Sequence, residues 1–138
     1  VIHLYNYVNR PWRTQELVDS VYKSQYANSV DGLSGNEDCG QMSAWYILNS
    51  MGFYQVCPGK PVYSIGRPAF DKAVINLPGE KTFSIVVKNN AKPHKYIESV
   101  LLNGKPLDTP FFNHQDITAG GVMEIKMTDR PTKWGVSK

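Results

Sequence analysis

The side chains of this chain that are best suited to chemistry gather in residues 35–46, which read GNEDCGQMSAWY. Asn36, Glu37 and Asp38 lie between two glycines and directly before a run with helical periodicity. Two adjacent carboxylates in this position suit two roles. One role is the acid/base end of an active site, where a carboxylate moves a proton. The other is a helix cap, in which Asp38 and Gln41 satisfy backbone donors of the first turn, and residue types alone favour this cap.

The cysteines and histidines do not indicate a second reactive site. Cys39 and Cys57 lack the paired Cys/His spacing of a zinc site, and their spacing leaves open whether they form a disulfide. We expect Cys39 to be a small packing residue, because no basic side chain beside it would favour the thiolate. His3, His94 and His114 have no mutual spacing typical of a metal site or proton relay, and we expect His94 and His114 at the surface or in turns.

The composition is that of a globular protein of about one domain. The chain has 138 residues, 41% of them hydrophobic and 20% charged. Its net charge of +3 is spread along the sequence without a Lys/Arg block, so nucleic-acid binding is not indicated. No stretch approaches the length of about 18 apolar residues expected of a membrane span, and we expect a soluble protein without one.

The first part of the chain, up to about residue 57, has a helical pattern. Pro11 suits a first helical position, and apolar residues at helix spacing from Leu17 to Tyr22 predict an amphipathic helix over about residues 11–24. A second helix follows the acidic stretch, with Gly52 at its end. Because its apolar residues occupy more than one face, we expect this second helix to be buried on most sides. These apolar residues are Met42, Trp45, Tyr46, Leu48 and Met51.

From about residue 60 the pattern changes to short β-branched and aromatic segments. The segments AVINL, TFSIVV, YIESVLL and VMEIKM have strand length, and Pro78-Gly79, Asn103-Gly104 and Gly120-Gly121 mark reversals. Asn-Gly is the strongest of these signals, because both residues tolerate the positive φ angles of a two-residue hairpin. Six to eight short strands without an intervening helix predict an antiparallel β-sandwich. Its expected core aromatic residues are Phe70, Phe83, Phe111 and Phe112.

The predicted fold class is therefore α+β, a helical pair followed by a β-sandwich. Two amphipathic helices cannot easily bury their apolar surface alone, so they either pack against the sheet or belong to a larger helical body. The chain begins with Val1 in an apolar and aromatic run. We interpret it as a piece of a longer protein.

Several long motifs resemble glycoside hydrolase family 92, the calcium-dependent exo-acting α-mannosidases. The run GLSGNEDCGQMSAWYILNSMGFYQVCPG is similar to the family signature, and LYNYVNRPWRTQ is similar to another family segment. YSIGRPAFDKAVINL, YIESVLLNGKPL, HQDITAGGVMEIKM and the terminal KWG resemble the closing β domain. The resemblance implies a C-terminal fragment, with residues 1–58 as the last helices of the catalytic α/α toroid and residues 59–138 as the C-terminal β-sandwich.

This resemblance implies that the parent enzyme removes terminal α-linked mannose from a glycan, in the manner of an α-1,2-mannosidase, by single-displacement inverting hydrolysis. Inversion needs two carboxyl groups roughly 6.5 to 9.5 Å apart, so adjacent residues cannot fill both roles. The family's base falls on the acidic loop, where we expect Asp38 first and Glu37 second. The general acid would lie outside this chain, and the fragment alone would be inactive.

The resemblance also implies a Ca²⁺ ion, for which the oxygen-bearing Asn36 is a candidate ligand. It implies as partners a mannose-containing glycan and the N-terminal part of the same enzyme, and it implies export to the periplasm, the cell surface or the medium. Trp12, Trp45 and Tyr46 suit a sugar-stacking platform, although aromatic residues at helix spacing are more typical of a core. The alternative function is a non-catalytic β-sandwich module for carbohydrate binding or scaffolding.

Overall fold

The structure is a computed structural model that describes residues 1–137. Its first part is helical and consists of η1 (Ile2–Val8), α1 (Pro11–Gln25) and α2 (Gln41–Met51). The two predicted helices are confirmed, with α1 one residue longer than expected. The 3-10 helix η1 was not predicted from the sequence; Asn9 caps its C-terminal end and takes a left-handed conformation with φ 58°.

Local sequence explains where α1 begins and where α2 ends. Pro11 is the first residue of α1, where its missing N–H leaves no helical hydrogen bond unmade. Gly52 ends α2 with φ 107°, and its N–H bonds back to the carbonyls of Leu48 and Asn49. A left-handed cap of this kind favours glycine, because a side chain would strain the backbone.

Two open β-sheets follow the N-terminal helices, so the architecture is mixed α+β. The smaller sheet has the order β1-β2-β7 and the larger sheet has the order β3-β4-β8-β5-β6. The strands of the smaller sheet are β1 (Phe53–Tyr54), β2 (Val62–Ile65) and β7 (Phe111–Asn113). The strands of the larger sheet are β3 (Lys72–Asn76), β4 (Thr82–Lys88), β5 (Tyr96–Leu102), β6 (Lys105–Pro106) and β8 (Gly121–Thr128).

Two details correct the expectation of a purely antiparallel β region without a helix. Strands β4 and β8 pair in parallel, from Phe83 opposite Gly121 to Lys88 opposite Lys126. The long excursion through β5, β6 and β7 gives the chain the length needed to return in the same direction. That excursion ends in the short helix α3 (His114–Thr118), whose capping box joins Asn113 and Asp116.

The Asn-Gly hairpin is confirmed. Asn103 and Gly104 have φ angles of 50° and 77° and connect β5 to β6, with Leu102 opposite Lys105. The Asn103 side chain also accepts a hydrogen bond from the Val122 N–H at 2.8 Å, so the turn is tied to the neighbouring strand β8.

The core lies between the two sheets. Phe83 of β4 and Phe112 of β7 stack across it with ring centroids 6.5 Å apart, so both are core residues as predicted. Phe111 is only half-buried and packs against Tyr7 of η1. The expectation that Phe70 is a core residue is wrong, because it lies on the link between β2 and β3, outside any strand, and is 43% exposed.

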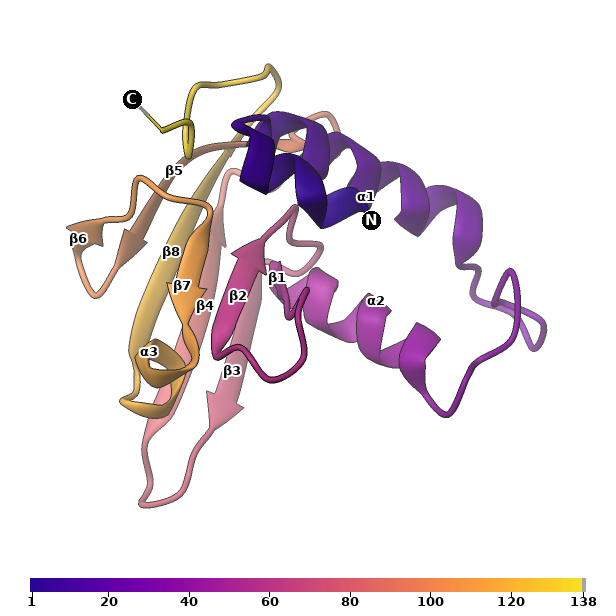
Figure 1. The fold of residues 1–138 in the computed structure, drawn as a ribbon, viewed down its shortest axis with the longest axis horizontal. Helices are drawn as coiled ribbons and strands as arrows, with labels where there is room; N and C mark the ends of the chain where they lie inside the picture. The colour runs from indigo at the N-terminus through magenta and orange to yellow at the C-terminus, as the bar shows by residue number, and fades with distance from the viewer. Residues whose placement is uncertain (138) are drawn as a thin grey trace.

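The helices η1, α1 and α2 pack on one side of the sheets, whereas α3 lies at the end of β7 (Figure 1). The Gln15 side chain on α1 accepts a hydrogen bond from the Ile97 N–H of β5 at 2.9 Å, and Leu48 and Met51 of α2 pack against the core. The expectation that α2 is buried on most sides is wrong, since only Asn49 and Ser50 are buried. Its other residues are half-buried or exposed. No helix within residues 1–137 is long and apolar enough to cross a membrane.

Candidate active site

The acidic loop, residues 36–40, joins the long link after α1 to the first turn of α2. This link is the part of the molecule furthest from β6 in Figure 1. Asp38, Cys39 and Gly40 take positive φ angles of 51°, 58° and 90° in succession. Two consecutive non-glycine residues in the left-handed region are an uncommon conformation, and such backbone is concentrated at functional sites.

The left-handed backbone determines which carboxylate caps α2. Glu37 Oε1 accepts a hydrogen bond from the Ser43 N–H at 2.9 Å, and the Glu37 carbonyl accepts one from Met42 at 3.2 Å. The predicted cap by Asp38 and Gln41 is wrong, because Gly40 is the N-cap residue and makes no side-chain cap bond. The turn at residues 38–40 instead brings Glu37 back over the first turn of the helix.

Asp38 is therefore left with an unengaged carboxylate. Its side chain is exposed and makes no hydrogen bond or ion pair with any residue from 1 to 137, and only its carbonyl bonds, to the Gln41 N–H at 3.3 Å. Glu37 is half-buried and has one oxygen engaged. Of the two adjacent acids, only Asp38 has both carboxylate oxygens free for a water molecule or a ligand.

The loop does not fit a complete calcium site. Ca²⁺ takes six to eight oxygen ligands. Asn36 and Asp38 are both exposed, one Glu37 oxygen is used by α2, and the described chain contains no cluster of three or more His, Cys, Asp or Glu residues that could hold a metal ion. These residues supply at most a fraction of the ligands that calcium requires.

An aromatic cluster lies between the end of α1 and α2, close to the acidic loop. Tyr26 and Trp45 stack with centroids 5.8 Å apart and planes 6° apart, and Tyr22 meets Trp45 and Tyr46 edge-on at 6.0 and 5.5 Å. The Tyr26 hydroxyl donates to the Met42 carbonyl at 2.8 Å. Burial, and next the negative charge of Glu37, raise the pKa of Tyr26. The cluster therefore fixes α2 against the end of α1, close to the acidic loop.

The three aromatic residues considered for a sugar platform do not lie together. Trp45 and Tyr46 both lie within the cluster, where each contacts Tyr22 and Tyr26. Trp12 is near the beginning of α1, about 15 Å along the helix from Tyr22. A single surface made by all three is excluded, and packing is the role of Trp45.

A buried polar network that the sequence did not indicate joins η1, α2 and β2. His3 Nε2 donates to Asn49 Oδ1 at 2.8 Å, and Asn49 Nδ2 donates to the Trp45 carbonyl at 2.9 Å. His3 Nδ1 lies 3.0 Å from Ser64 Oγ, which accepts from Asn6 Nδ2 at 2.7 Å. Burial lowers the pKa of His3 to about 4, so His3 is neutral at pH 7.

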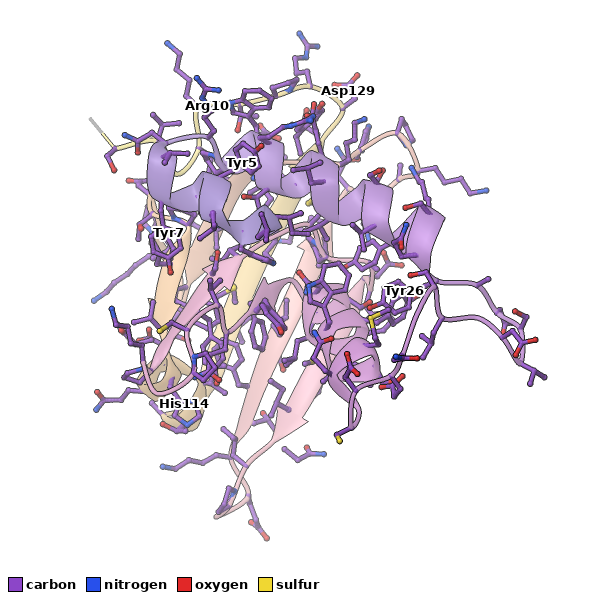
Figure 2. The ribbon with its side chains drawn as sticks, turned by 45° about the vertical axis from the view of Figure 1, so that its right-hand side comes forward. Tyr5, Tyr7, Arg10, Tyr26, His114 and Asp129 are labelled. Carbon is purple, nitrogen blue, oxygen red and sulfur yellow. The ribbon has the colours of Figure 1, made fainter. Side chains whose placement is uncertain are left out.

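The other histidines and the cysteines are peripheral. His114 bonds to the Tyr63 hydroxyl at 2.9 Å and lies far from Tyr26 in Figure 2, and His94 bonds to the Asn89 carbonyl. Both were expected at the surface or in turns, and both are confirmed there. Cys39 and Cys57 are free and exposed, so no disulfide joins them and the expected packing role of Cys39 is wrong.

Residues 1–129 match the glycosyl hydrolase family 92 catalytic domain. The chain belongs to glycosyl hydrolase family 92, as its motifs indicated.

Solved structures of family members have the same fold over nearly all of this chain. A family GH92 α-mannosidase from Bacteroides thetaiotaomicron, whose structure was also solved with mannoimidazole, is 34% identical with a TM-score of 0.93. The chain is covered to 99% and that enzyme to 18%. A family GH92 inverting mannosidase from the same bacterium is 39% identical with a TM-score of 0.92, with 99% and 19% covered.

A curated relative is an uncharacterized secreted glycosidase from Arthroderma benhamiae, 28% identical over 98% of this chain and 18% of its own length. The chain thus spans about a fifth of the length of the relatives it matches. It is a fragment of a family 92 catalytic domain.

Proposed function

We propose that this chain is the C-terminal part of an α-mannosidase that removes terminal α-linked mannose, in the manner of an α-1,2-mannosidase, by single-displacement inverting hydrolysis. The observation that supports the proposal is that the two adjacent acids of the acidic loop have different contacts. Glu37 caps α2, while Asp38 presents a free carboxylate from left-handed backbone. The names of the two bacterial relatives support the reaction, since they are an α-mannosidase and an inverting mannosidase.

In this proposal Asp38 is the general base. Its carboxylate takes a proton from a water molecule as that water attacks the anomeric carbon from the face opposite the leaving group. Glu37 positions the loop by holding the first turn of α2. The general acid must lie roughly 6.5 to 9.5 Å from Asp38, too far for its sequence neighbour, so it comes from another part of the enzyme.

The proposal assigns residues 1–58 to the last helices of the catalytic α/α toroid and residues 59–138 to the C-terminal β-sandwich. All helices longer than seven residues in the described chain precede residue 52, and the strands of both sheets follow it. The domain boundary itself remains a prediction.

The remaining parts of the proposal concern partners. The natural substrate is a mannose-containing glycan, and the catalytic partner is the N-terminal part of the same enzyme. Calcium is expected from family membership, but the residues here do not complete a site for it, so we assign it no step. If Asn36 binds the ion, most of the other ligands come from elsewhere. The name of the fungal relative supports export from the cell.

The alternative is a non-catalytic scaffold or carbohydrate-binding module. The exposure of Asp38 favours this role for the 138-residue chain by itself, because an exposed base without an acid partner has no catalytic environment. The two functions are compatible, because the isolated chain can be a scaffold while the same residues form part of the active site in the complete enzyme.

Replacement of Asp38 with Asn in the complete enzyme tests the proposal. The substitution keeps the size of the side chain but removes the base, so hydrolysis of an aryl α-mannoside should fall by at least about 100-fold. A change of less than about threefold would return Asp38 to a structural role.

A further inference from the structure

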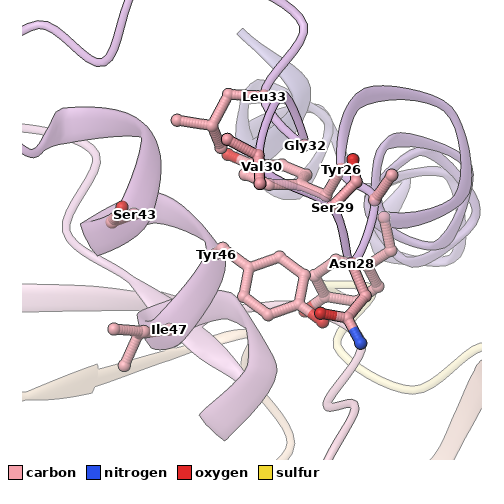
Figure 3. A pocket seen from close by; sticks show the side chains of 11 residues that line it. Tyr26, Asn28, Ser29, Val30, Gly32, Leu33, Ser43, Tyr46 and Ile47 are labelled. Atoms are coloured by element: carbon pink, nitrogen blue, oxygen red, sulfur yellow. The ribbon is translucent and has the colours of Figure 1, made fainter.

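A cavity lies between the α1–α2 link and α2. Its volume is about 490 Å³, within the range of roughly 300–1,000 Å³ that is typical of ligand pockets. Figure 3 shows the Tyr46 ring beside Asn28, with Ser43 and Ile47 on α2 across from the link. Ser43, Tyr46 and Ile47 are three and four residues apart and so share one helix face. The other lining residues are Tyr22, Tyr26, Ala27, Ser29, Val30, Gly32 and Leu33.

The wall formed by the link is preformed. Ala27 N–H donates to the Gly32 carbonyl at 2.8 Å, and Tyr26 and Leu33 form an antiparallel bridge. A Cβ on Gly32 would lie 2.0 Å from the Ala27 carbonyl oxygen, so this turn admits only glycine. A wall that is ordered before binding reduces the entropy that a ligand must overcome.

The chemistry of the lining selects a neutral ligand with both polar and apolar faces. None of the lining residues carries a charged side chain. Across residues 1–137, the side chains of Asn28, Ser29, Ser43 and Tyr46 make no hydrogen bond with other protein groups, so their donors and acceptors are free. An aromatic ring beside uncommitted amide and hydroxyl groups matches a hexose, whose C–H face packs on the ring while its hydroxyls bond to the polar groups.

The cavity adjoins the acidic loop through Ser43. Its side chain lines the cavity, and its backbone N–H is the donor to Glu37. Resting on the proposed function, we infer that this cavity is a subsite for a neutral hexose unit of the glycan, stacked on Tyr46. A glycan held here would lie beside the first turn of α2, which Glu37 caps, and the subsite would set affinity without moving a proton.

Binding is tested on the 138-residue chain with methyl α-mannoside as the probe. In a ¹⁵N-labelled sample, saturable shifts of the Asn28, Ser43 and Tyr46 amides are expected, and Ser43→Ala should weaken the apparent affinity by about two- to tenfold, as for one lost hydrogen bond. Ser99→Ala, an exposed serine on β5, is the matched control and should not change the affinity. Shifts confined to the acidic loop, or no saturable shifts, would overturn the inference.

Kinetics in the complete enzyme provide a second test of the subsite. Asn28→Ala and Ser43→Ala both replace exposed residues, and Tyr46→Phe keeps the aromatic packing, so each variant should fold. A subsite predicts a raised KM for an oligomannoside with kcat unchanged. An unchanged KM in all three variants would overturn the inference. The effect of Asp38→Asn is measured on kcat. The subsite and the general-base role of Asp38 can therefore fail independently.

Discussion

The carboxylate of Glu37 accepts the backbone N–H of Ser43 at 2.9 Å and so caps the helix from a position six residues upstream. This contact separates the roles of two adjacent acids that have the same chemistry. Glu37 is committed to the fold, and Asp38, turned away by left-handed backbone, is not. The cap can be broken without touching the proposed base.

Replacement of Glu37 with Ala should lower the free energy of unfolding by about 1 kcal/mol, because a first-turn N–H of α2 loses its acceptor. Glu37→Gln keeps an oxygen at the same reach and should cost only a fraction of that. Urea unfolding of the two variants, followed by circular dichroism, measures the difference. Equal stability of the Ala and Gln variants would contradict the capping role.

Acidification should destabilise the chain through His3. Its folded pKa of about 4 lies below the ordinary 6.5, so the unfolded chain binds more protons between these values and stability falls as the pH falls from 6.5 to 4. The loss approaches roughly 3 kcal/mol and is complete below the folded pKa. His3→Gln should be less stable at pH 7 but should lack this part of the pH dependence.

Urea unfolding at pH 7 and pH 4 measures the effect, with His114→Gln as the control because His114 is exposed. The His114 variant should retain the pH dependence of the original chain. An identical pH dependence in the His3 variant and the original chain would show that His3 is not responsible.

The structure places Phe83 in the core and Phe70 outside it, a difference that the sequence did not indicate. Phe83→Ala should cost about 3–5 kcal/mol, because its fully buried ring fills the space between the two sheets. Phe70→Ala should change stability by less than about 1 kcal/mol, since Phe70 is partly exposed and lies outside the strands. Thermal unfolding of both variants is the measurement, and a larger loss for Phe70 would contradict the described core.

The sequence predicted well those features that depend on one or two neighbouring residues. Pro11, Gly52 and the Asn103-Gly104 turn act through backbone angles of one or two residues, and all three lie where the pattern placed them. The pairing of β4 with β8 was not predictable in the same way, because its direction depends on about thirty intervening residues. Sequence alone likewise could not separate Phe70 from Phe83.

The candidate site shows the same division between local and long-range information. The acidic pair was visible in the sequence, but its capping role was assigned to the wrong acid, since three consecutive left-handed residues cannot be deduced from residue types. The His3 network was missed because His3 finds Asn49 and Ser64 at separations of 46 and 61 residues. No spacing rule covers contacts of that kind.

The 138-residue chain should not hydrolyse an aryl α-mannoside, even with millimolar calcium. Asp38 is exposed and the described residues supply neither a complete calcium site nor an acid at the required separation. Release of the aryl group by the purified chain is the measurement. Turnover that EDTA abolishes would show that the chain assembles the metal site by itself.

The most direct test compares Asp38→Asn with Glu37→Gln in the complete enzyme and adds sodium azide to each. Azide is a nucleophile that needs no base, so it should restore turnover to the Asp38 variant and yield a β-mannosyl azide, the inverted product. The Glu37 variant should keep its activity within about threefold and gain nothing from azide. The account would be contradicted if Glu37→Gln were the inactive, azide-rescued variant and Asp38→Asn hydrolysed the mannoside normally.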